Sequence, residues 1–288
     1  MLREKGRSFA LILVLLAVLA LAGCGSSETK VNADEVVQDA LAAQANVDSS
    51  HMVINIDATA EGTLNGEPLD AGLDAALTAD IDWANKKMKA DLGMNADYNG
   101  VSFPISVKMY AVDNCSYTQM TFGLMADNWT KSEFPMDFWF SQDQDNGQFV
   151  DGILQSTEAE SLPSQKVGGV SCYVLQLEPD IAALQQMLSE QGASVEEMPD
   201  IDSLISDLSI KVWVAKDTSY VTKIEIVLSA HLTGEAMGDP ESSDVLDISL
   251  TVTMEMTDVN EPVSIELPNE AKNAEWGSPL NMFSSFGF

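Results

Sequence analysis

Basic residues are scarce in this sequence. The 288-residue chain has 14 Lys and Arg residues against 45 Asp and Glu, which gives a formal net charge of −31 at pH 7. Nucleic-acid binding depends on Lys and Arg side chains at phosphates, so this composition argues against a nucleic-acid partner. The same charge repels anionic lipid headgroups, and we expect the folded body to stand off a membrane surface.

Motifs of catalysis and metal binding are also missing. The sequence contains no Gly-x-Ser-x-Gly, no glycine-rich phosphate loop and no Cys-x-x-Cys. The two histidines, His51 and His231, fall at the ends of predicted strands, where a histidine is usually a surface residue. A run at 143–147 begins like a calcium loop, but Leu154 stands where the twelfth-position glutamate belongs. We therefore predict no enzymatic activity, no cofactor and no metal site.

Cys24 follows a three-part N-terminal signal. Three basic residues within the first seven positions precede an apolar run over 9–20, which is too short for a membrane-spanning helix. The sequence Leu-Ala-Gly-Cys ends at Cys24 and resembles a bacterial lipoprotein signal. That resemblance implies a signal peptide over 1–23, a diacylglycerol on the Cys24 thiol and a lipidated tether over 24–31. The protein would then be extracytoplasmic, in the bacterial cell envelope. The alternative is an ordinary secretory signal with a chance cysteine.

Two further cysteines, Cys115 and Cys172, fall in predicted strands. Outside the reducing cytosol such a pair can persist as a disulfide. Two buried free thiols are the alternative, because the geometry of pairing cannot be read from sequence.

Alternation of apolar and polar residues predicts long strands in the first and last thirds of the chain. The pattern covers 52–60, 73–83, 88–96, 103–109, 210–214, 224–232 and 246–256. Asn65-Gly66 and Asn99-Gly100 are hairpin turn signals between neighbouring runs. Tight turns between long strands favour antiparallel pairing of sequence neighbours.

The middle of the chain is mixed. Strands are predicted at 114–122, 129–132 and 170–177. Apolar residues at helical spacing predict helices at 144–154, 181–188 and 201–208, and Asn32 is a capping residue for a further helix that starts there.

These elements predict one α+β domain over 32–288. Each strand has one apolar face that must be covered, and a sheet of this length tends to curl. We expect a curled antiparallel β-sheet, a half-barrel, with a few helices packed on its concave face. The apolar C-terminal tail, 279–288, is expected to pack across the sheet, and the alternative is that it occupies the mouth of the cavity.

The apolar face of the predicted sheet is rich in alanine and methionine and poor in aromatic residues. Small and flexible side chains leave room for a guest, whereas a fully packed core is the alternative. The candidate cavity residues are Leu77, Ile81, Met88, Leu92, Ile226, Leu228, Leu250, Val252 and Met254.

Two phrases of the sequence resemble a known family. Val-Trp-Val at 212–214 is followed by Lys-Asp-Thr, Tyr-Val and Lys223, and Pro-Val-Ser-Ile-Glu-Leu-Pro fills 262–268. Both are similar to segments of LppX/LprG-type and LolA-like bacterial lipoproteins. The resemblance implies a half-barrel with helices on its concave side and an apolar cavity. Members carry lipids or lipoproteins across the envelope, and relatives bind proteins in stress sensing.

Two functional hypotheses follow. The first is a membrane-anchored lipoprotein whose apolar cavity binds a hydrophobic small molecule, a lipid or an acyl chain. The second is a non-enzymatic module with a closed core that binds another envelope protein.

Overall fold

The computed structural model describes residues 31–123, 125–126, 128–134, 157–179, 205–234 and 241–277. The chain divides into two units, 1–31 and 32–288, and the second holds every element named below. No helix within these ranges is long and apolar enough to cross a membrane. The elements are α2 (Ala33–Gln44), β1 (Ser49–Leu64), β2 (Glu67–Asp82), β3 (Lys87–Tyr98), β4 (Val101–Val112), β5 (Cys115–Phe122), β6 (Met125–Ala126), β7 (Thr130–Glu133), β8 (Thr157–Val167), β9 (Val170–Pro179), β10 (Ile205–Ala215), β11 (Val221–Thr233), β12 (Val245–Thr257), the 3₁₀ turn η2 (Ala271–Asn273) and β13 (Glu275–Trp276).

The helix α2 begins where its capping residue predicts. Asn32 lies in extended conformation, and its side chain accepts a hydrogen bond from the backbone N–H of Asp34. This bond satisfies one of the free donors of the first turn. The helix buries Val36, Val37 and Ala40 on one side, so its apolar stripe is covered.

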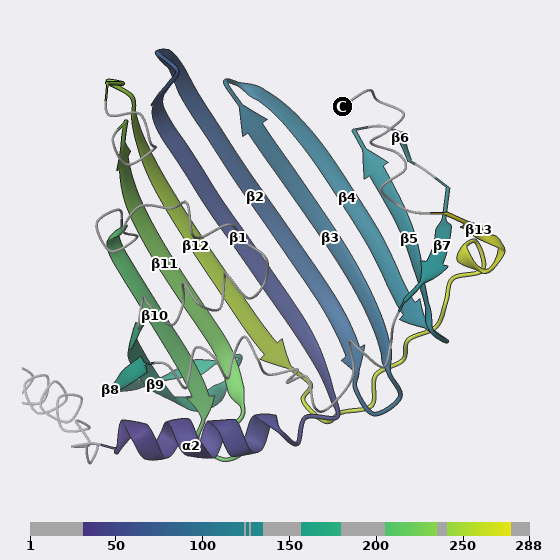
Figure 1. Ribbon diagram of the computed structural model, residues 1–288. Coiled ribbons are helices and arrows are strands. Elements are labelled where there is room, and N and C mark those ends of the chain that lie inside the picture. The colour runs from purple at the N-terminus through teal and green to yellow at the C-terminus, as the bar shows by residue number, and fades with distance from the viewer. Residues whose placement is uncertain are drawn as a thin grey trace, which may run out of the picture. The chain divides into compact units, whose positions relative to one another are not determined.

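One open sheet of 13 strands accounts for the rest of the fold (Figure 1). The order is β13-β7-β5-β4-β3-β2-β1-β12-β11-β10-β9-β8, with β6 paired to β5 off this path. No pairing joins the outermost described strands, β8 and β13. All neighbours are antiparallel except β13 and β7. The predicted antiparallel sheet is thereby confirmed.

Helices on the concave face remain a prediction. The segments 144–154 and 181–188 lie outside the described residues, as does the tail 279–288. The described residues hold one α-helix, α2.

Tight turns set the register of the first four strands. Asn65 and Gly66 have φ of 54° and 76°, and Asn99 and Gly100 have 47° and 81°. Two successive residues with positive φ make the turn whose twist matches a hairpin, which is why Asn-Gly is favoured there. From Ser49 paired with Asp82 to Leu64 paired with Glu67, β1 and β2 run without a break in register.

Two segments depart from the expectations. Residues 205–208 belong to β10, so the helix predicted over 201–208 is wrong there. Ile205 and Leu208 are three positions apart, a spacing typical of one helix face. A register shift between Ile205 and Asp207 inserts an extra residue and brings both side chains to one side of the strand instead. The strand β8 has no apolar alternation to reveal it. It is an edge strand, and its register shift between Leu162 and Gln165 spans Pro163.

Candidate functional site

The pairing register brings all nine candidate cavity residues to one side of the sheet. Directly paired residues project to the same side of a sheet, so each cross-strand pair fixes a common face. The pairs are Leu77 with Leu92, Ile81 with Met88, Ile226 with Val252 and Leu228 with Leu250. Ile54 of β1 pairs with both Leu77 and Met254 and joins the two halves. We call this side the apolar face and the opposite side the polar face.

Burial divides the apolar face into two parts. Where it crosses β9, β10 and the start of β11 it is a packed core, in which Leu175, Leu177, Val212 and Ile224 are at most 2% exposed. Among the nine candidates, only Ile81 and Met254 are buried, at 4% and 9% exposed. The other seven are half-buried.

Small and flexible side chains form a second buried cluster on this face. Ala79 and Ala90 pair across β2 and β3 and pack with the methionines Met52, Met88 and Met109. A methyl group fills little space, and a methionine side chain adapts to what lies against it. Leu77 and Met88 pack against this cluster and are half-buried.

The two strand cysteines do not form a disulfide. Both are free thiols in the structure, Cys115 half-buried and Cys172 buried. Seven strands separate β5 from β9, which places the thiols about 38 Å apart along the sheet. Cys115 packs against the cluster of Val112 and Tyr117, whereas Cys172 packs with Val174 and Trp213. Of the two alternatives, the structure has the two free thiols.

The predicted lipidation site lies outside the described residues. Cys24, the signal over 1–23 and all but the last residue of the tether over 24–31 precede residue 31, the first that the structure describes. The anchor therefore stays a prediction from sequence.

Acidic side chains gather on the polar face. Glu61 pairs across strands with both Asp70 and Asp247, and Asp57 pairs with Asp74. Like charges directly opposite one another destabilise a sheet. The two histidines lie on this face beside carboxylates: His51 Nδ1 is 2.7 Å from Asp80, and His231 Nδ1 is 2.6 Å from Asp247. The described residues hold no group of three or more His, Cys, Asp or Glu side chains suited to a metal ion.

Asp244 secures the turn between β1 and β2. Its carboxylate accepts hydrogen bonds from the backbone N–H groups of Asn65, at 2.7 Å, and Gly66, at 2.9 Å. The Gly66 bond is the largest cause that lowers the pKa of Asp244 below its usual range. The carboxylate is buried and holds the hairpin end against the start of β12.

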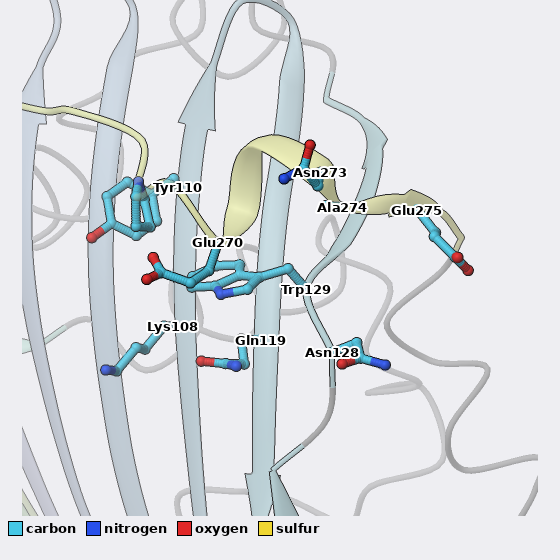
Figure 2. A pocket seen from close by; sticks show the side chains of 10 residues that line it. Lys108, Tyr110, Gln119, Asn128, Trp129, Glu270, Asn273, Ala274 and Glu275 are labelled. Carbon is cyan, nitrogen blue, oxygen red and sulfur yellow. The ribbon is translucent and has the colours of Figure 1, made fainter.

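A pocket of about 590 Å³ lies on the polar face, where sequence reasoning placed no site (Figure 2). It lies between β4, β5, the residues before β7 and the segment that leads into β13. The lining residues are Lys108, Tyr110, Gln119, Asn128, Trp129, Pro268, Glu270, Asn273, Ala274 and Glu275. We call it the polar-face pocket.

The walls of the polar-face pocket come from distant parts of the chain. Trp129 and Tyr110 meet edge to face, with ring centroids 5.9 Å apart. Ile265 and Ala271 are buried against Val112 and hold the C-terminal wall in place. Local patterns could not reveal a site assembled over 160 residues. The one sequence feature that could have indicated this pocket is that Tyr110 and Lys108 occupy polar-side positions of β4.

Comparison with known proteins identifies the family. A family model described as "Family of unknown function (DUF6612)" matches residues 32–275. The chain belongs to this family. No curated protein matches the sequence.

Several solved structures are similar to this chain at low identity. The Mycobacterium tuberculosis lipoprotein LppX is 14% identical with a TM-score of 0.36, over 81% of this chain and 97% of LppX. A LolA superfamily protein from Nitrosomonas europaea is 11% identical with a TM-score of 0.21, over 83% of this chain and 96% of that one. The Pseudomonas aeruginosa MucA/MucB complex matches at 8% identity and a TM-score of 0.25, over 83% of this chain and 62% of that one. LppX and LolA are the groups that the sequence resembles.

Proposed function

We propose that this protein is a membrane-anchored extracytoplasmic lipoprotein that binds a hydrophobic ligand, a lipid or an acyl chain, on its apolar face. One observation carries the proposal: seven of the nine candidate residues on that face are only half-buried. A solid core would bury them as fully as Leu175 and Val212, which are 0% exposed.

The energetics favour a guest on this surface. Apolar surface left in contact with water forgoes about 25 cal/mol per Å² relative to burial. A contiguous apolar patch is a common mark of a binding site. An acyl chain laid along the half-buried part of the face would cover Leu228, Leu250 and Val252 together, because these residues are cross-strand neighbours.

The lipid anchor and the negative charge together suggest how the protein is held at a membrane. Cys24 would carry the diacylglycerol, and residues 25–31 are short and polar enough to act as a flexible tether. The body has an excess of carboxylates that anionic headgroups repel. The lipid on Cys24 therefore holds the protein at the membrane, while the apolar face stays available for a separate ligand.

Substitution by tryptophan tests the proposal. Leu250 is half-buried, so Leu250→Trp fills free space and is expected to abolish uptake of a pyrene-labelled phospholipid with little change in melting temperature. Met254 is 9% exposed beside Ile224, so Met254→Trp overpacks and costs about 1–3 kcal/mol of folding stability.

The matched control is Ser249, which precedes Leu250 on β12. Ser249 is exposed on the polar face, so Ser249→Trp is expected to leave both uptake and melting unchanged. Equal uptake by the Leu250→Trp and Ser249→Trp variants would contradict binding on the apolar face. If Leu250→Trp lowers the melting temperature as much as Met254→Trp does, the closed, protein-binding module would be favoured instead.

A further inference from the structure

The polar-face pocket has the construction of a second ligand site. It lies on the opposite side of the sheet from the apolar face, because Lys108 and Tyr110 alternate with the apolar-face residues Val107 and Met109 along β4. Its volume of about 590 Å³ falls within the range of small-molecule sites, roughly 300–1,000 Å³. A ligand here would not compete for space with one on the apolar face.

The aromatic wall of this pocket is fixed before any ligand arrives. Trp129 packs on the hydrophobic cluster that contains Ala271 and Ile265, and Tyr110 braces it edge to face at 61°. The wall opposite is also held: β13 pairs with β7, and Gly277 donates its backbone N–H to the carbonyl of Lys131. Pre-organised walls lower the entropy cost of binding.

The polar lining contains groups of every kind. Figure 2 shows Trp129 at the centre, with Lys108 and Gln119 below it and the carboxylate of Glu270 at the left end of the indole. Amide side chains come from Gln119, Asn128 and Asn273, and an amide both donates and accepts hydrogen bonds.

The charges of the lining disfavour an anion. One ammonium, on Lys108, stands with two carboxylates, on Glu270 and Glu275. A cation would meet two attractive groups and one repulsive group, and it is the competing class of ligand that the spermidine titration tests. Hydroxyl groups match amides and carboxylates at once, because a hydroxyl also donates and accepts. The apolar face of a sugar ring can lie against an indole, which presents a broad flat surface.

We propose that the polar-face pocket binds a neutral carbohydrate unit, with a sugar ring stacked on Trp129 and its hydroxyls bonded to the amides and to Glu270. This site is independent of the hydrophobic-ligand site. The protein would then recognise a saccharide on one side of the sheet and carry an apolar ligand on the other.

Calorimetric titration of the full-length protein tests this proposal, with cellobiose, maltose and N,N′-diacetylchitobiose as probes. We expect at least one disaccharide to bind with a Kd below about 1 mM. Its affinity should be the same in 50 mM and 500 mM NaCl, because no net charge is neutralised. Trp129→Ala should raise Kd at least tenfold, whereas Tyr98→Ala, at an exposed aromatic residue of β3 outside the lining, should not change it.

A second variant guards against misfolding. Asn273 is exposed, so Asn273→Ala should weaken binding with no loss of melting temperature, and Asn269→Ala, outside the lining, is its control. Leu250→Trp should leave disaccharide binding intact, which separates this site from the apolar face. Three results would each overturn the proposal. They are the absence of binding for all three disaccharides, binding that neither Trp129→Ala nor Asn273→Ala affects, and Trp129-dependent binding of spermidine or acetate instead.

Discussion

Two leucines on the apolar face should respond differently to the same truncation. Leu177 lies in the packed part and is 1% exposed, beside Ile210, which is 2% exposed. Leu228 lies in the half-buried part and pairs with Leu250, which is also half-buried. Both side chains lose the same atoms when replaced by alanine. The difference in cost therefore reports how tightly each site is filled.

The expected magnitudes follow from burial. Leu177→Ala loses the full transfer energy and leaves a cavity, which costs about 3 kcal/mol. Leu228→Ala loses roughly half of the transfer energy and creates no closed void, so we expect about 1 kcal/mol. For a domain of this size, 1 kcal/mol shifts the melting temperature by roughly 2–4 °C. The two variants should therefore melt about 6–12 °C and about 2–4 °C below the unsubstituted protein.

Thermal unfolding followed by circular dichroism measures both losses in delipidated protein, and urea titration gives the free energies independently. Equal losses at Leu177 and Leu228 would refute the reasoning, because they would mean that the face is solid at both positions.

Three further outcomes test other parts of the account. Cys24→Ala should abolish labelling by an alkynyl fatty acid, and a variant that remains in the membrane fraction with a mature N-terminus would contradict the anchor. Gly62→Ala should destabilise by about 1–3 kcal/mol, because φ is +150° and the new Cβ would overlap a backbone carbonyl of β12; Gly93→Ala, with open space around it, is the control for urea unfolding. Asp244→Asn should remove part of the acid sensitivity of folding. The folded-state pKa of Asp244 is lowered, so its carboxylate stabilises the fold above the unfolded pKa of about 3.9, and this stabilisation is lost as the pH falls through the lower folded pKa. An unchanged acid-unfolding profile would contradict this role.

The sequence was most informative where local rules act alone. The period-two pattern around Leu77 and Leu92, with an Asn-Gly turn at either side, fixed strands and register, because a one-residue slip would move every apolar side chain to the other face. The same logic placed the nine candidate residues on one side. Their half-burial was not predictable, since it depends on what packs above the sheet.

Local rules failed where distant contacts decide. Ile205 and Leu208 are spaced as on one helix face, and only the pairing with β11 shows that a bulge accommodates this spacing in a strand. The apolar residues of the edge strand β8, Ala159, Leu162 and Val167, do not alternate, so only its pairing with β9 reveals it as a strand. The polar-face pocket joins Tyr110, Trp129 and Glu270, which are brought together only by the path of the C-terminal segment.

The most direct test of the central claim is mass spectrometry of organic extracts from the full-length protein, purified without harsh detergent, beside its Leu250→Trp variant. If the apolar face binds a hydrophobic ligand, the unsubstituted protein should yield a lipid or fatty acid in stoichiometric amount, in addition to the acyl chains attached at Cys24. The folded Leu250→Trp protein should lack that lipid. An extract free of apolar molecules, or the same lipid at the same amount in both proteins, would contradict binding on the apolar face.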